Sequence, residues 1–426
     1  MKVLIISHPP MATYNNMGKT FLSLFSCFEK DELCQLYIYP SYPNRDACSS
    51  YFRVTDKEVL RSFLGKRKIG AEVDRERIRD DQGAYEHEED RAFYRSRKNK
   101  SAFRRLMRDA MWRFSPWYGK DLKTWLDREQ PDCIFVAPGV AKFLYDMALR
   151  IAKDRKLPIV SYICDEYYFV KKPDQLLDRV RLRLLQKKME QLMQRSNHLV
   201  VISEELKTEY AAHFGVETSV IMTGADSVPA AAEEQQAPGQ LCYFGNIRCN
   251  RYHTLAEIGR ELESINRERG TDYRLKIYTG EQDPAILREL QQIAAVDLCG
   301  FVTGEAYGQA VAQAQLLLHT EAFDEASMDF TRHSVSTKIA EALASGIPLV
   351  AYGPEELSSI RHLLRHRCAL VATSRDELRD VLLTALEDEQ ARTLAVNHAR
   401  HAAEQLHDSE RNSRLLHGIL LAASEM

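Results

Sequence analysis

The stretch from 334 to 354, SVSTKIAEALASGIPLVAYGP, constrains the fold more than any other part of the sequence. It predicts a helix followed directly by a buried strand. Ser334 or Ser336 can cap the helix, and the residues after them are good helix formers. Gly346 stands where a left-handed residue ends a helix, Pro348 prevents its continuation, and a short apolar strand follows. Helix and strand in such close succession are typical of an α/β fold.

The start of this helix is a predicted seat for a diphosphate. Its first backbone N–H groups lack partners within the helix and lie at the positive end of the helix dipole. Ser336, Thr337 and Lys338 add two hydroxyls and an ammonium group. Glu341 lies on the same face, where a carboxylate can bind vicinal hydroxyls. Phosphates and a diol indicate a nucleotide; the alternative is a capped helix whose lysine and glutamate form a solvated pair.

The segment STKIAEALASGIPLVAYGP resembles the C-terminal nucleotide-binding segment of GT-B glycosyltransferases, in particular the retaining family four, or group 1. In that family the helix start holds the donor diphosphate, and the second Glu of an E-x7-E motif binds the ribose. The resemblance gives the ribose role to Glu341 and a catalytic role to Lys338. The first Glu, which touches the donor sugar in the family, is replaced here by His333, a second catalytic candidate. Three carboxylates are alternatives for the missing Glu: Asp324, Glu325 and Asp329.

The resemblance also implies donor contacts in two loops of the C-terminal half. Phe301 and Val302 stand in the turn where the family cradles the donor base. Arg248 and Arg251 are nearest to the basic pair that the family brings to the diphosphate, although their spacing departs from its pattern. The alternative is two exposed loop arginines.

The N-terminal residues predict a second doubly wound α/β unit, with a strand from Lys2 to Ser7 and a helix from Lys19 to Phe28. Gly18, at the helix start, would let a diphosphate approach the backbone, and the resemblance matches it to a turn that faces the donor. The residues around it match half of a P-loop, but Thr13 stands where that loop needs a glycine.

The strand–helix–strand pattern from Asp132 to Ile163 predicts a parallel crossover. Asp165 follows the second strand, at the sheet edge where α/β proteins bind ligands. Its carboxylate can bind an acceptor hydroxyl or take its proton as a catalytic base; the alternative is a helix cap.

Two further segments of this half are unusual. Residues from about 61 to 100 are densely charged and predict a solvated insertion. The next residues, Phe103–Trp125, predict a basic amphipathic helix with tryptophans nearby, which is typical of interfacial membrane binding. The alternatives are a helix packed on its own domain and a wall of the acceptor site.

The composition excludes some classes of function. A net charge of −3 in 426 residues gives no indication of nucleic-acid binding. Nine scattered cysteines, none spaced as CxxC, are typical of reduced cytoplasmic thiols. The sequence shows no signal peptide and no apolar run long enough to cross a bilayer. We therefore expect a cytoplasmic protein that can also lie on the inner face of the cell membrane.

The length predicts two or three domains. The resemblance implies the GT-B fold, with two Rossmann-like domains facing across a cleft. We expect an acceptor-side domain at 1–228, a linker, a nucleotide-sugar-binding domain at 240–400, and a helix at 401–426 that packs back on the first domain.

The implied reaction is the transfer of a hexosyl group from a nucleotide-diphospho-sugar to the hydroxyl of a saccharide or lipid-linked acceptor, in cell-surface polysaccharide or glycolipid synthesis. No cofactor is expected, and no metal, because no carboxylate–histidine cluster has metal-ligand spacing. The alternatives are a GT-B-shaped sugar-nucleotide epimerase and an inactive nucleotide-binding scaffold, the latter because His333 replaces a glutamate.

Overall fold

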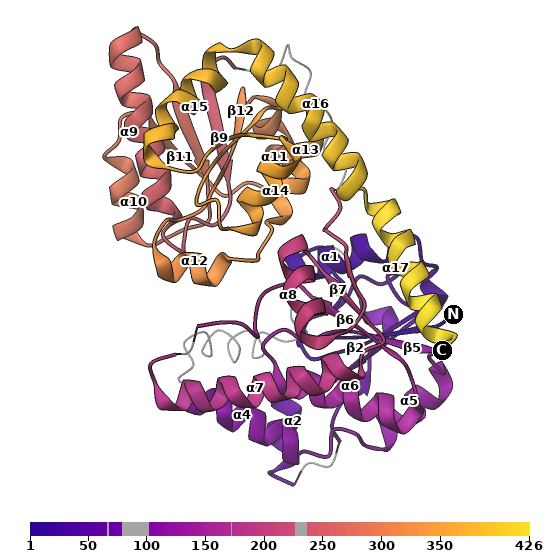
Figure 1. Ribbon diagram of the computed structural model, residues 1–426. Coiled ribbons are helices and arrows are strands. Elements are labelled where there is room, and N and C mark those ends of the chain that lie inside the picture. Colours follow the sequence, from indigo (N-terminus) through magenta and orange to yellow (C-terminus); the bar gives the residue numbers. More distant parts are fainter. Residues whose placement is uncertain (66–67, 79–101, 172, 226–236) are drawn as a thin grey trace. The chain divides into compact units, whose positions relative to one another are not determined.

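The computed structural model describes residues 1–65, 68–78, 102–171, 173–225 and 237–426 (Figure 1). These residues form two units, Met1–Ile221 with Ser409–Met426, and Met222–Asp408. Most of the predicted charged insertion and most of the predicted linker lie outside the described residues. No helix within the described ranges is long and apolar enough to span a membrane.

The first unit is built on an eight-stranded sheet in which every neighbouring pair is parallel except β3 and β4. In spatial order the strands are β4 (Ala71–Glu72), β3 (Ser50–Arg53), β2 (Leu33–Tyr37), β1 (Val3–Ser7), β5 (Cys133–Ala137), β6 (Ile159–Ile163), β7 (His198–Val201) and β8 (Thr218–Val220). Its helices are α1 (Asn16–Leu24), α2 (Asp56–Ser62), α4 (Ala102–Phe114), α5 (Lys120–Glu129), α6 (Lys142–Arg155), α7 (Leu176–Arg195), α8 (Glu204–Phe214) and α17 (Ser409–Ser424).

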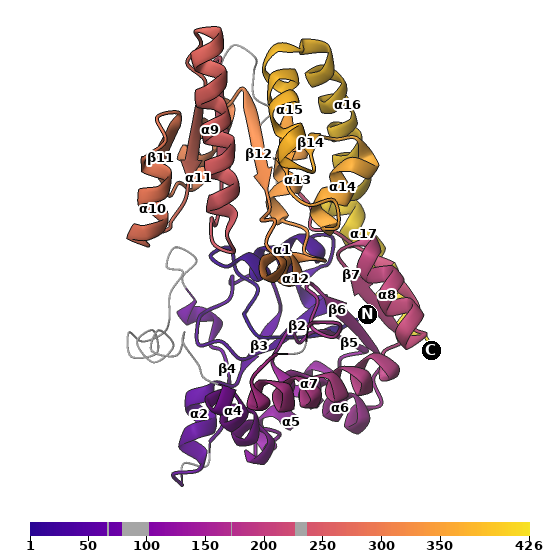
Figure 2. The same cartoon turned by 60° about the vertical axis from the view of Figure 1, so that its left-hand side comes forward.

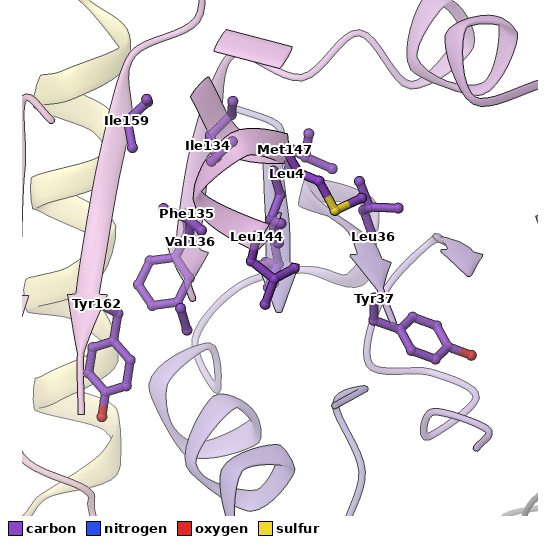
Figure 3. Packing of buried hydrophobic residues seen from close by; sticks show 14 of the residues in the cluster. Leu4, Leu36, Tyr37, Ile134, Phe135, Val136, Leu144, Met147, Ile159 and Tyr162 are labelled. Atoms are coloured by element: carbon purple, nitrogen blue, oxygen red, sulfur yellow. The ribbon is translucent and has the colours of Figure 1, made fainter. Parts of the chain in front are cut away.

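Helices cover both faces of this sheet, which explains why its central strands are almost continuously apolar (Figure 2). Leu144 and Met147 of α6 lie against the strands on one face (Figure 3). On the other face Phe135 of β5 meets Phe21 and Phe25 edge to face, with ring centroids 6.3 and 5.1 Å away. The final helix α17 packs on α1, β5 and β6 within this unit.

One strand begins earlier than the sequence pattern indicates. The pattern predicts a strand from Leu36 to Tyr39, whereas β2 begins at Leu33, because the polar Gln35 is accommodated in the core. Its amide donates to Ser7 Oγ at 2.9 Å, and its oxygen accepts the Met11 amide at 3.1 Å. A buried polar side chain with its hydrogen bonds made does not end a strand.

The tryptophans do not rim an outer face of α4, so that part of the membrane interpretation is wrong. Trp112, Trp117 and Trp125 are all buried. Trp112 stacks on Phe143 with a centroid distance of 4.3 Å, and its Nε1 donates to Asp56 at 2.8 Å. The large apolar side chains that α4 exposes among its described residues are Phe103, Met107 and Phe114 instead.

The second unit has a six-stranded sheet whose neighbouring strands are all parallel. In spatial order the strands are β11 (Val296–Gly300), β10 (Arg274–Tyr278), β9 (Gln240–Phe244), β12 (Leu316–Thr320), β13 (Leu349–Tyr352) and β14 (Leu370–Ala372). Its helices are α9 (Arg251–Arg269), α10 (Pro284–Gln291), α11 (Gly304–Ala312), α12 (Glu325–Thr331), α13 (Thr337–Ala344), α14 (Ser358–His366), α15 (Arg375–Glu387) and α16 (Glu389–Leu406).

Both sheets reverse their strand order once, between β1 and β5 in the first unit and between β9 and β12 in the second. Each sheet therefore has the Rossmann arrangement, and the predicted α/β class is confirmed. Ligands of such sheets bind beyond the carboxyl ends of the strands at the point of reversal. Each unit thus has its own expected position for a ligand.

Candidate functional site

The start of α13 carries the predicted diphosphate seat. Ser336, rather than Ser334, is the N-cap, and its hydroxyl accepts the Lys338 amide at 3.4 Å. The side chains of Thr337 and Lys338 are exposed, while the opposite face of the helix is buried. Gly346 has a φ of +76°, as expected for the residue that ends the helix. Two hydroxyls, an ammonium group and the first amides of a helix therefore lie at one end of α13.

Lys338 reaches across to the point where the sheet reverses. Its Nζ donates to the carbonyl of Phe244, the last residue of β9, at 2.9 Å. Gly245 follows with a φ of +147°, and a Cβ there would lie only 2.9 Å from Nζ. The backbone conformation favours glycine here, and a side chain at this position would also displace the flexible end of the lysine.

The carboxylate of Glu341 is held by a tyrosine that the sequence analysis missed. Tyr307 of α11 donates its hydroxyl to Glu341 Oε2 at 2.6 Å. Its ring lies edge to face on Phe244, with centroids 5.0 Å apart, and Phe244 stacks on Tyr278 at 4.7 Å. Burial and the neighbouring carboxylate raise the pKa of Tyr307, so it donates at neutral pH. No local sequence signal could find this pair, because 34 positions separate its members.

The two arginines expected near the diphosphate are both paired with carboxylates. Arg248 contacts Glu281 through Nε and Nη2 at 2.6 and 3.0 Å, and this contact lowers the pKa of Glu281 to about 2. Arg251 contacts Glu321, just after β12, through the same two atoms at 3.0 Å each. Burial raises the pKa of Glu321 although Arg251 opposes this. Arg251 is the first residue of α9 and is mostly buried, so it is not an exposed loop residue.

The remaining candidates of the second unit lie in two loops. Phe301 and Val302 follow β11, and the Phe301 side chain is largely exposed. His333 is buried just beyond the end of α12. Asp324, an alternative for the missing glutamate, caps α12 through the Ser327 amide at 3.0 Å and accepts from Asn250 at 2.9 Å. The carboxylate of Asp324 is therefore already used to cap α12 and to bind Asn250.

Gly18 lies inside the first turn of α1 and not in a loop before it. Its amide donates to the capping side chain of Asn15 at 2.6 Å. A Cβ at this position would lie 2.4 Å from the carbonyl oxygen of Ala12. Close packing of the helix on the preceding loop thus accounts for this glycine in the first unit.

Asp165, the other candidate of the first unit, does not itself line the nearby cavity of about 450 Å³, whereas Cys164 before it and Tyr167 after it do. The cavity lies at the carboxyl ends of β1, β5 and β6, the point where this sheet reverses. Tyr167 lines it and donates its hydroxyl to Asp165 Oδ2 at 3.1 Å. His8, also in the lining, accepts through Nε2 from Arg108 Nη2 at 3.2 Å, because a guanidinium group can only donate. Sequence reasoning passed over His8 as the end of a strand.

Two family models match the sequence of this chain. The model described as Glycosyltransferase Family 4 matches residues 79–227, and the model described as Glycosyl transferase-like matches residues 259–418. Together they cover more than half of the chain. The chain belongs to the family-four glycosyltransferases. It is therefore a nucleotide-sugar-dependent glycosyltransferase, as the sequence predicts.

Solved structures show that this glycosyltransferase has the GT-B fold. Anabaena HepE in complex with UDP aligns with a TM-score of 0.65 at 13% identity, over 99% of this chain and 100% of its own. WaaG, a glycosyltransferase involved in lipopolysaccharide biosynthesis, aligns with a TM-score of 0.55 at 14% identity, over 98% of this chain and 100% of its own. Sucrose-phosphate synthase from Thermosynechococcus elongatus aligns with a TM-score of 0.62 at 10% identity, over 99% of this chain and 100% of its own. No curated protein matches the sequence.

Only some of the predicted residues of the glycosyltransferase come together. Lys338, Glu341 and the start of α13 converge at the carboxyl end of β9 in the second unit, together with the unpredicted Tyr307. In the first unit Asp165 accepts from Tyr167, which lines the cavity together with the unpredicted His8.

Proposed function

We propose that this enzyme transfers a hexosyl group from a uridine diphosphate sugar to an acceptor hydroxyl, with retention of configuration and without a metal ion. The observation that carries the proposal is the arrangement on α13. This helix presents its N-terminal amides, Lys338 and Glu341 at the reversal point of the sheet, with Glu341 held by Tyr307 of α11. Uridine is proposed because HepE is described in complexes with UDP and UDP-glucose.

Each part of the donor has a candidate partner in the second unit. The helix amides, with Ser336 and Thr337, hold the diphosphate, and Glu341 accepts hydrogen bonds from the ribose hydroxyls. The exposed ring of Phe301, with Val302 next to it, contacts the base. His333 takes the position beside the donor sugar.

The leaving diphosphate gains charge as the glycosidic bond breaks, and the protein supplies positive groups to stabilise it. Lys338 is held ready at the end of β9. Arg248 and Arg251 keep donors available although they are paired, because each uses Nε and Nη2 toward its carboxylate and a guanidinium group has five N–H donors. Such a set of donors makes a metal ion unnecessary.

The acceptor is assigned to the first unit, with Asp165 as the group that binds its hydroxyl or takes its proton. WaaG, of the same fold, takes part in lipopolysaccharide biosynthesis. We therefore place this enzyme in cell-surface polysaccharide or glycolipid synthesis, in the cytoplasm at the inner face of the membrane.

Release of free UDP from UDP-glucose and from other UDP-sugars, with and without an acceptor extract, tests this proposal. Release that is stimulated by the extract supports transfer. Sugar isomerisation without an acceptor would instead identify an epimerase. UDP binding without turnover would identify a scaffold, the alternative raised by His333.

A further inference from the structure

The cavity of the first unit is unusually rich in arginine. Arg105 and Arg108, one turn apart on α4, and Arg181 of α7 all line it. Asp109 is the one carboxylate among the lining residues that the structure describes. Asp109 is itself buried, and burial raises its pKa, so it opposes the arginines less than an exposed carboxylate would.

One of the three arginines, Arg108, is bound to a buried carboxylate. Arg108 Nε donates to the fully buried Asp56 at 2.8 Å, and its guanidinium group lies 4.8 Å from the ring centre of Phe143. Trp112 donates to the same carboxylate oxygen. The charge of Arg108 is therefore largely offset by Asp56, and this network fixes α4 beside the cavity.

The other two arginines are not neutralised in this way. Within the described part of the chain, Arg105 makes no ion pair and no side-chain hydrogen bond. Arg181 donates through Nη2 to the carbonyl of Val140 at 3.2 Å, while its Nη1 makes no hydrogen bond to the described residues. Two guanidinium groups with unused donors at the wall of one cavity form a site that can bind an anion.

We propose that this cavity binds a phosphoryl group of the acceptor, with Arg105 and Arg181 as its ligands. The inference rests on the proposed function, because it names the chemical class of the acceptor assigned to this unit. Guanidinium groups match the geometry of phosphate oxygens and form charge-assisted hydrogen bonds with them. A phosphoryl group can accept from Arg105 and from Nη1 of Arg181, and it offsets the excess positive charge. The acceptor hydroxyl then lies within the same molecule, fixed relative to Asp165 and Tyr167.

The phosphoryl group can belong to a soluble sugar phosphate or to a lipid headgroup. Both sources share the chemistry that the arginines recognise. The helices that carry them also expose apolar side chains, among them Met107 on α4 and Leu176 on α7. Because these exposed apolar side chains can contact lipid, the test includes a separate measurement with lipid vesicles.

The test measures binding of glucose 6-phosphate to the full chain at low salt, with glucose as the uncharged control. We compare the wild type with R105Q/R181Q and with R179Q/R183Q, which removes two exposed arginines of α7 but none from the cavity lining. The expected result is binding of the phosphate compound only, weakened at least about tenfold in R105Q/R181Q and less than twofold in the control, since each lost charged hydrogen bond costs about that factor.

The lipid arm uses vesicles that contain phosphatidic acid in place of the sugar phosphate. Loss of vesicle binding in R105Q/R181Q, beyond that in R179Q/R183Q, assigns the cavity to a lipid-borne phosphate. Absence of binding in both arms, or equal loss in both double variants, overturns the inference. UDP affinity, measured in the same samples, reports on the second unit, so a failure of the proposed donor site is seen separately.

Discussion

The hydroxyl of Tyr307 donates to the carboxylate of Glu341 at 2.6 Å and joins α11 to α13 in the second unit. This contact orients the carboxylate that we assign to the ribose. It also gives Tyr307 a positioning role, since its hydroxyl acts through Glu341.

We predict that Glu341→Ala weakens UDP binding by about 1.5–3 kcal/mol, the cost of a hydrogen bond to a charged group. Tyr307→Phe keeps the ring on Phe244 and removes only the hydroxyl, so it should cost less, about 1 kcal/mol. Calorimetric titration with UDP measures both, and Gln309→Ala, an exposed change on the same helix, is the control. UDP affinity that is unchanged in Glu341→Ala would remove the ribose assignment.

The sequence was sufficient to predict the α/β class, the end of α13, and the placement of Lys338 and Glu341 on one helix face, and it gave Ser336 as one of two possible caps. These features depend on contacts within a few residues. The partners of those residues could not be predicted, because Tyr307 and Phe244 come from distant parts of the chain. The same holds for Arg105 and Arg181, whose convergence on one cavity depends on the packing of α4 against α7.

Lys338→Ala should lower turnover more than donor affinity, because the charge on the diphosphate grows in the transition state. Initial rates of UDP release and the Kd for the donor, measured on the same preparation, give the two effects. An equal loss in both quantities would show that the lysine serves binding alone.

Gly245→Ala should reproduce the effect of losing the lysine. A Cβ at 245 lies 2.9 Å from Lys338 Nζ, and the backbone conformation there disfavours any other residue. We expect a displaced ammonium group and reduced turnover. Gly308→Ala is the matched control, because a Cβ at 308 would meet no described atom within 4 Å. If Gly245→Ala turned over as fast as the wild type, the contact of Lys338 with the end of β9 would not be needed for catalysis.

Two buried histidines should make the second unit less stable in mild acid. His407 Nδ1 donates to the Thr223 carbonyl, so its Nε2 accepts from His362 Nε2 at 3.0 Å, and both rings are neutral. Burial lowers the pKa of His362 to about 2 and that of His407 to about 4, with His407, His366 and Arg365 also lowering that of His362.

The unfolded chain binds protons on these histidines below about pH 6.5, whereas the folded chain does so only at lower pH. The free energy of unfolding is therefore not reduced by these histidines above pH 6.5. Below that pH each histidine lowers it by ~1.4 kcal/mol for every pH unit, and for His407 this loss ends at about pH 4. Thermal unfolding at pH 7.5 and 5.5 measures this loss. His362→Gln should reduce the pH dependence and the exposed change His401→Gln should not. An identical dependence in both variants would contradict the assignment.

The exposed face of α4 provides the last prediction, on contact with a membrane. Phe103, Met107 and Phe114 are exposed, with Arg104 and Arg113 also exposed on the same helix. Apolar side chains can enter the interface while the arginines attract anionic headgroups, and salt weakens that attraction. We expect co-sedimentation with phosphatidylglycerol vesicles at low salt, and its loss at high salt or in Arg104→Glu/Arg113→Glu.

The variant for this test must avoid Arg108, because its pair with buried Asp56 supports the fold and charge reversal there would unfold α4. Lys120→Glu, an exposed charge reversal on α5, is the control and should bind vesicles as the wild type does. Absence of binding at low salt would remove the membrane contact. The apolar residues of α4 would then need another partner, and the phosphoryl group bound in the cavity would have to come from a soluble acceptor.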